Sequence, residues 1–120
     1  MTSETRSREV WATFEALRAS GPTKGPTMNS GVIYAVVGLV NFLGYAPRDF
    51  EAVPTTDVVR SLFTTRDTLI RGWSDAESAG YLERESRKEP GQLRRGYIRF
   101  TDEFLALIDR IVEVGEQSDG

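Results

Sequence analysis

Residues 65–84 of this 120-residue chain read TRDTLIRGWSDAESAGYLER. Leu69, Trp73 and Ala76 stand at i, i+4 and i+7, a spacing that places side chains on one face of a helix. We therefore predict an amphipathic helix over residues 65–79, because Thr65 can cap its first turn and Gly80 suits the position after its last. Residues 81–87, which follow, predict a β-strand.

A shorter helix is predicted just before this segment. Residues 57–62 follow two threonines, Thr55 and Thr56, either of which can cap a helix, and residues 63–64 supply a tight turn. Downstream, Glu89-Pro90-Gly91 predicts a turn and the alternating residues 95–100 predict a return strand. The order is thus short helix, turn, longer helix and β-hairpin.

The remaining segments predict further helices. Apolar residues at helical spacing indicate helices over residues 7–20 and 101–114, the second capped by Thr101. Residues 29–43 are apolar nearly all round, which predicts a buried helix, with a strand as the competing interpretation because β-branched residues are frequent. Two Gly and two Pro in residues 21–27 predict a linker. We expect one domain over residues 1–120, mainly α with a small β-hairpin (α+β).

The composition excludes several kinds of chemistry. The chain has no Cys and no His, which removes disulfides, the common zinc sites, thiol nucleophiles and His-based acid–base catalysis. A carboxylate-bound Mg²⁺ or Ca²⁺ stays open on composition alone. We expect no enzyme activity, no metal and no cofactor. Without a signal-peptide core or a long enough apolar run, we expect a cytoplasmic protein without a membrane span.

The charge is unevenly distributed. The net charge is −3, which is unusual for a protein that binds a polyanion. Residues 57–99, however, hold nine Lys or Arg against seven Asp or Glu, and residues 84–99 alone hold six against two. The positive charge is therefore concentrated around the predicted longer helix and hairpin.

Residues 65–84 resemble the recognition helix and first wing strand of bacterial regulators of the MarR and PadR type. The segment 97–104, YIRFTDEF, is similar to the exit from the wing into a long helix in the same families. The resemblance covers residues 56–101 and implies a winged helix-turn-helix that binds double-stranded DNA and regulates transcription. In such a module one helix enters the major groove, which admits a helix and exposes base edges to it.

The resemblance also implies which residues act. On the longer helix and the wing the predicted DNA contacts are Thr65, Arg66, Thr68, Arg71, Arg87, Lys88, Arg94 and Arg95. Families of this type dimerise through their terminal helices, which implies a homodimer interface made by Trp11, Phe14, Leu17, Phe104, Leu107, Ile108 and Ile111. No residue indicates a particular small-molecule effector.

Three other interpretations stay open. The module can serve protein–protein contacts instead of DNA, which the net negative charge and the acidic Asp75 and Glu77 favour. It can belong to a plasmid or phage replication or maintenance protein, since such proteins use the same module. The arginines of the helix and the wing can also be ordinary solvated surface charges.

Overall fold

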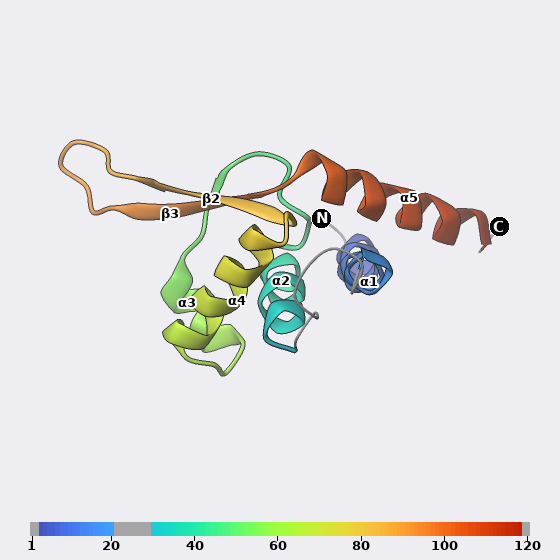
Figure 1. The fold of residues 1–120 in the computed structure, drawn as a ribbon, viewed down its shortest axis with the longest axis horizontal. Coiled ribbons are helices and arrows are strands. Elements are labelled where there is room, and N and C mark those ends of the chain that lie inside the picture. The colour runs from blue at the N-terminus through green and yellow to red at the C-terminus, as the bar shows by residue number, and fades with distance from the viewer. Residues whose placement is uncertain (1–2, 21–29, 119–120) are drawn as a thin grey trace.

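The computed structural model describes residues 3–20 and 30–118, and Figure 1 shows its arrangement. The described chain forms five helices and three strands, in the order α1 (Ser3–Ser20), α2 (Ser30–Leu43), β1 (Glu51–Ala52), α3 (Thr55–Ser61), α4 (Arg66–Ser78), β2 (Leu82–Arg87), β3 (Arg95–Phe100) and α5 (Asp102–Ser118). The predicted α+β class is confirmed. The predicted linker at 21–27 lies outside the described residues.

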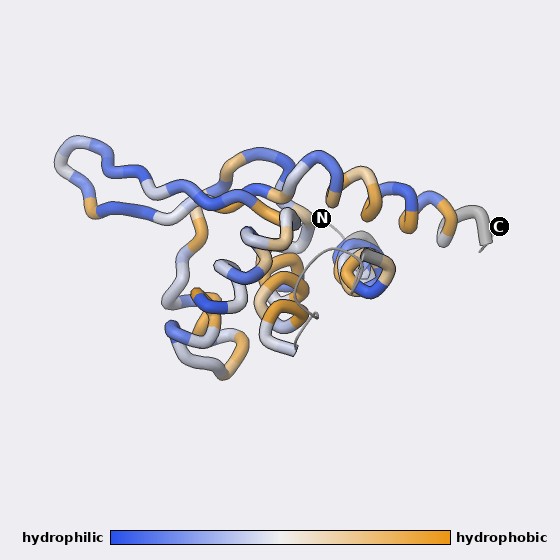
Figure 2. The backbone as a smooth tube through the Cα atoms, in the orientation of Figure 1, coloured by the Kyte–Doolittle hydropathy of each residue, from blue (hydrophilic) through white to orange (hydrophobic). Residues whose placement is uncertain are grey.

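Helix α2 is the centre of the core. It packs against α1 on one side and against α4 on the other. Val36, Leu39 and Val40 are fully buried, and Figure 2 shows apolar residues along most of the helix. The prediction of a buried helix here is confirmed over the competing strand. Gly44, at φ +91°, ends the helix, and its N–H bonds the Val40 carbonyl at 2.7 Å.

The three strands form one antiparallel sheet in the order β1-β3-β2. The β2–β3 pairing runs from Leu82 opposite Phe100 to Arg87 opposite Arg95. Because side chains alternate between the faces of a strand, Leu82, Ile98 and Phe100 share the face that is buried in the core. The other end of the hairpin extends beyond the helices (Figure 1).

The predictions need correction at one strand, one helix cap and two helix ends. No element was predicted between residues 43 and 55, yet Glu51 and Ala52 pair with β3. Helix α3 follows Pro54 and has no side-chain cap, so neither Thr55 nor Thr56 caps it. Helix α1 begins at Ser3 instead of residue 7, and α5 continues to Ser118 instead of ending at 114. The two terminal helices pack against each other.

The segment that joins α2 to the sheet is tied to α5. Arg48 donates two hydrogen bonds to the Asp109 carboxylate, at 3.0 and 2.5 Å. Both side chains are about half exposed, so this ion pair contributes modestly to stability.

Over residues 3–20 and 30–118, no helix combines the length and the hydropathy that crossing a bilayer requires.

Candidate nucleic-acid interface

Helix α4 is held by a threonine cap and an apolar face. Thr65, with extended backbone, accepts a hydrogen bond from the Thr68 N–H at 3.2 Å, as predicted for an N-cap. The predicted stripe of Leu69, Trp73 and Ala76 is buried. Gly72 is buried as well, against α2. The inner face of α4 is therefore fixed to α2, and the opposite face is directed outward.

The outward face of α4 carries the predicted contact residues. Arg66, Thr68 and Arg71 are exposed, and neither arginine has a partner among the described side chains. The Thr65 hydroxyl donates to Thr68 Oγ1 at 2.8 Å. The Thr65 oxygen accepts the Thr68 N–H and its one hydrogen goes to Thr68 Oγ1, so Thr65 both caps the helix and orients the Thr68 side chain. The Thr68 hydrogen stays available to an outside acceptor.

A groove brings the start of α4 together with the hairpin. It has a volume of about 590 Å³. Its basic lining residues are Arg66 from α4, Arg94 just before β3, and Arg95 at the first position of β3. Thr55 and Thr56, at the start of α3, line the same groove. Nothing in the sequence shows that these two regions meet, because Arg66 and Arg94 are far apart along the chain. Because guanidinium groups suit phosphate, this groove is the candidate site for an anion.

The hairpin residues predicted as contacts divide into two groups. Lys88, Arg94 and Arg95 are exposed, and Arg94 makes one weak contact, a 3.2 Å hydrogen bond to Ser86. Arg87 differs from these. Its guanidinium donates to Glu85 Oε2 at 2.7 Å and lies 4.5 Å from the centre of the Tyr97 ring. Arg87 is thus already engaged on the sheet face that is turned away from the core, where its charge is partly compensated by Glu85.

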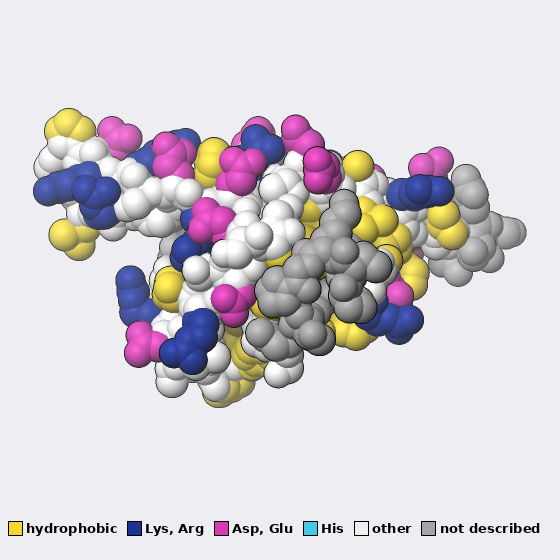
Figure 3. All heavy atoms as spheres, in the orientation of Figure 1, with side chains coloured by type: hydrophobic (Ala, Val, Ile, Leu, Met, Phe, Trp, Pro, Cys, Tyr) yellow, Lys and Arg dark blue, Asp and Glu magenta, His cyan; other side chains and the backbone are white. Residues whose placement is uncertain are grey.

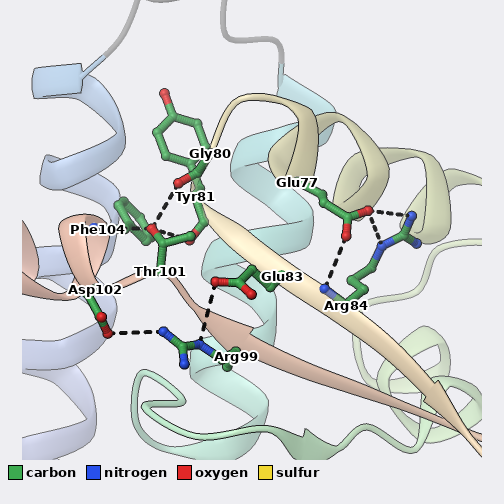
Figure 4. A network of polar contacts seen from close by, with 9 residues as sticks. All are labelled: Glu77, Gly80, Tyr81, Glu83, Arg84, Arg99, Thr101, Asp102 and Phe104. Carbon is green, nitrogen blue, oxygen red and sulfur yellow. Dashed lines mark hydrogen bonds and ion pairs between the residues drawn. The ribbon is translucent and has the colours of Figure 1, made fainter.

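Arg84 braces the hairpin against α4. Glu77 accepts the backbone N–H and the Nε of Arg84, each at 3.1 Å (Figure 4). In the sequence, Glu77 was only an acidic residue that favours protein–protein contacts. The contact with Arg84 compensates its charge and, in addition, fixes the angle between helix and hairpin. The only sign of this contact in the sequence is that Glu77 and Arg84 stand seven positions apart, on either side of the predicted end of the helix and start of the strand.

A polar cluster at the other end of the hairpin fixes the start of α5 (Figure 4). The Thr101 hydroxyl donates to the Gly80 carbonyl at 2.8 Å and accepts from the Phe104 N–H at 3.3 Å, so the predicted cap is confirmed. Arg99 donates to Asp102 at 3.0 Å. The C-terminal end of α4, the hairpin and α5 are thereby joined at one point.

Basic side chains lie in several separate places on the surface. In Figure 3 they lie at the free end of the hairpin and over the lower end of the α3–α4 pair, with acidic side chains between them, and others lie over α5 and beside α1. A second hollow, on the outer face of α4, mixes Arg66 and Arg71 with Asp67 and Asp75. The basic surface is therefore discontinuous, with its highest concentration at the groove shared by α4 and the hairpin.

No protein-family model, curated protein or solved structure significantly matches this chain.

The residues predicted for a dimer interface do not lie on one exposed surface. Leu17, Phe104 and Ile108 are buried inside the monomer, because α1 packs against α5 of the same chain. That part of the prediction is corrected: these three form core. Trp11 and Phe14 remain 49% and 37% exposed. Leu107 and Ile111 are half-buried, and Val114, which was not predicted, is 55% exposed.

A cleft of about 310 Å³ lies between α4 and the sheet, with Ile70, Trp73 and Tyr97 in its wall. Among the described residues, no group of three or more His, Cys, Asp or Glu side chains is placed to hold a metal ion.

Proposed function

We propose that this protein is a winged helix-turn-helix protein that binds double-stranded DNA as a homodimer and regulates transcription. In this proposal α3 and α4 are the helix-turn-helix, α4 is the reading helix, and the β2–β3 hairpin is the wing. The observation that carries it is the groove in which Arg66 of α4 meets Arg94 and Arg95 of the hairpin. Two elements that would enter neighbouring DNA grooves are thus separated by a basic hollow of a size to take the phosphate backbone.

The reading helix would enter the major groove with its first two turns. Arg66, Thr68 and Arg71 are exposed there, and Arg and Thr are suited to base edges and phosphates. Asp75 lies further along the same helix and would repel phosphate at close range. Because Glu77 is compensated by Arg84, the acidic half of the helix is less repulsive than the sequence alone suggests.

The homodimer would form through the end of the molecule opposite the wing. The exposed apolar side chains of α1 and α5 are Trp11, Phe14 and Val114, at 49%, 37% and 55%. Figure 1 shows α5 and the hairpin at opposite ends of the molecule. A dimer formed by α1 and α5 would therefore leave both reading helices and both wings free for DNA. A symmetric dimer reads two half-sites about one helical turn, roughly 34 Å, apart.

Salt-dependent binding tests the proposal. The probe is a labelled random duplex of about 30 base pairs, roughly three helical turns, followed by fluorescence anisotropy from about 50 to 200 mM salt. Wild type should lose affinity steeply with salt. Arg66→Ala/Arg95→Ala should weaken binding at every sequence and reduce the magnitude of the slope of log K against log salt by about two.

The control is Arg18→Ala/Arg110→Ala, which removes the same charge from exposed positions on α1 and α5. It should leave the slope of the wild type nearly unchanged, because these arginines lie outside the groove. If the two double variants behave alike, the binding reflects net charge and the assigned interface is wrong.

A second candidate function is a winged helix that binds another protein. The observation that favours it is the outer face of α4, where Asp67 and Asp75 alternate with Arg66 and Arg71. Such a mixed surface suits a partner protein with complementary charges better than a uniform polyanion. Binding to random DNA that is absent near physiological salt would support this candidate. A replication or maintenance protein of a plasmid or phage would use the same DNA-binding surface. The binding experiments therefore do not distinguish such a protein from a transcriptional regulator.

A further inference from the structure

The free end of the hairpin presents one large apolar side chain to solvent. Leu93 is 87% exposed and lies beyond the last paired residues of the strands, Arg87 and Arg95. Single exposed leucines are common on protein surfaces, so exposure by itself indicates nothing. The position of Leu93, at the end of a projecting and basic arm, is what distinguishes it.

The arm has a defined reach and an ordered end. Each strand has six residues, which at about 3.3 Å per residue gives a length of roughly 20 Å. At the tip the Gln92 N–H bonds the Glu89 carbonyl at 3.0 Å, and Gly91 has φ +76°. Pro followed by a left-handed Gly is the pattern of a type II turn. Leu93 directly follows this turn, and it is therefore placed where the chain begins its return toward β3.

Basic residues surround this leucine. Lys88 and Arg94 are exposed on either side of the turn, and Arg94 and Arg95 also line the groove shared with Arg66. The charge would bring the tip onto the sugar–phosphate backbone. The minor groove is about 6 Å wide and 7.5 Å deep. Leu82, Ile98 and Phe100 are buried in the core, so about half of the strand length, roughly 10 Å, projects with the tip and exceeds that depth.

Resting on the proposed DNA-binding function, we infer that Leu93 is a wedge that enters the minor groove and partly unstacks one base step. Leu is among the apolar side chains that proteins insert in this way, and such wedges kink the duplex by about 20–90° toward the major groove. The bend would turn the flanking duplex toward α4. A pyrimidine–purine step such as TA is the preferred place, because it unstacks most easily.

A bending measurement tests the wedge separately from binding. The probe is a duplex of about 30 base pairs, roughly three turns, with a donor and an acceptor at its ends and one central TA step that carries 2-aminopurine. Anisotropy gives binding, energy transfer gives the bend, and 2-aminopurine fluorescence gives unstacking. Wild type should raise both energy transfer and 2-aminopurine emission on binding.

Leu93→Ala should keep the salt-dependent binding and lose both the bend and the rise in 2-aminopurine emission. Leu93→Met, which keeps a long apolar side chain, should retain them. Gln92→Ala, which changes the neighbouring exposed side chain and leaves Leu93 in place, should behave as wild type. Binding without a bend, or a bend that Leu93→Ala preserves, would overturn the wedge and leave DNA binding intact. No binding by wild type at low salt would overturn both.

Discussion

The indole Nε1 of Trp73 donates a hydrogen bond of 3.0 Å to the backbone carbonyl of Ala35, and both residues are almost fully buried. This contact joins the middle of α4 to the middle of α2. It orients α4 about its own axis, because the indole can reach that carbonyl only from one side. The outward direction of Arg66 and Arg71 is thus a consequence of a core contact.

Trp73→Phe should lower the free energy of unfolding by about 1–3 kcal/mol, because it removes both the hydrogen bond and part of the packed volume. Trp73→Ala should cost about 3–5 kcal/mol. Urea denaturation at fixed protein concentration measures both. Trp11→Phe is the matched control, since Trp11 is 49% exposed, and it should cost less than about 1 kcal/mol. Equal losses of unfolding free energy for Trp73→Phe and Trp11→Phe would show that the hydrogen bond to Ala35 does not stabilise the protein.

Gly72→Ala should destabilise the protein although alanine is the better helix former. A Cβ at residue 72 would lie 2.7 Å from the Ala35 Cβ and 2.7 Å from the Gly31 carbonyl oxygen. Because one of these neighbours is backbone, α4 must move away from α2. We expect a loss of about 1–3 kcal/mol in unfolding free energy. At Gly96 a Cβ meets nothing within 4 Å, so Gly96→Ala is the control and should change stability by less than about 0.5 kcal/mol. A stabilised Gly72→Ala would contradict the observed packing of α4 on α2.

Phe63→Gly should stabilise the protein. Phe63 has φ +53° in the turn between α3 and α4 and is 97% exposed. The left-handed conformation costs an L-residue about 1–2 kcal/mol, and glycine escapes that cost while gaining freedom in the unfolded chain. The net gain should be about 0.5–1 kcal/mol, measured by thermal and urea unfolding. Phe63→Ala keeps the Cβ and should give no gain. If Phe63→Gly is the less stable of the two, the side chain makes a contact that outweighs the strain.

Glu9 should make stability depend on pH. Burial raises its pKa, the nearby Arg48 opposes that shift and Asp109 adds to it. Glu9 Oε2 is buried and has no hydrogen-bond partner among the described residues. A carboxyl whose pKa is raised on folding contributes stability below its unfolded pKa, and that stability is lost as the pH rises through the folded pKa.

Glu9→Gln should therefore have a higher melting temperature than wild type at pH 7. The difference should shrink as the pH falls toward about 4, near the ordinary pKa of a glutamate, because the wild-type carboxyl then carries its proton as well. Calorimetric melting curves at several pH values measure the difference. A gap that stays constant from pH 7 to pH 4 would mean that the amide acts through packing, with no contribution from ionisation.

Local patterns were sufficient for most of the secondary structure. The apolar period predicted α4, and the threonine caps at Thr65 and Thr101 were confirmed, because a cap is an interaction between residues three positions apart. The turn before Gln92 was likewise encoded by Pro90 and Gly91. By contrast, β1 was not predicted: two residues become a strand only because β3 lies beside them.

The sequence by itself determined which residues are apolar and at which period, and therefore which faces of the helices are buried. The tertiary structure decided what covers those faces: Leu17 and Ile108 are covered by the same chain, so they are core and not free for a partner. It also decided that Arg66 and Arg94 share one groove, while Arg87 stacks on Tyr97 instead. The physical reason is the same in each case. Periodicity records the direction of a side chain relative to its own backbone, whereas its partner depends on how distant segments pack.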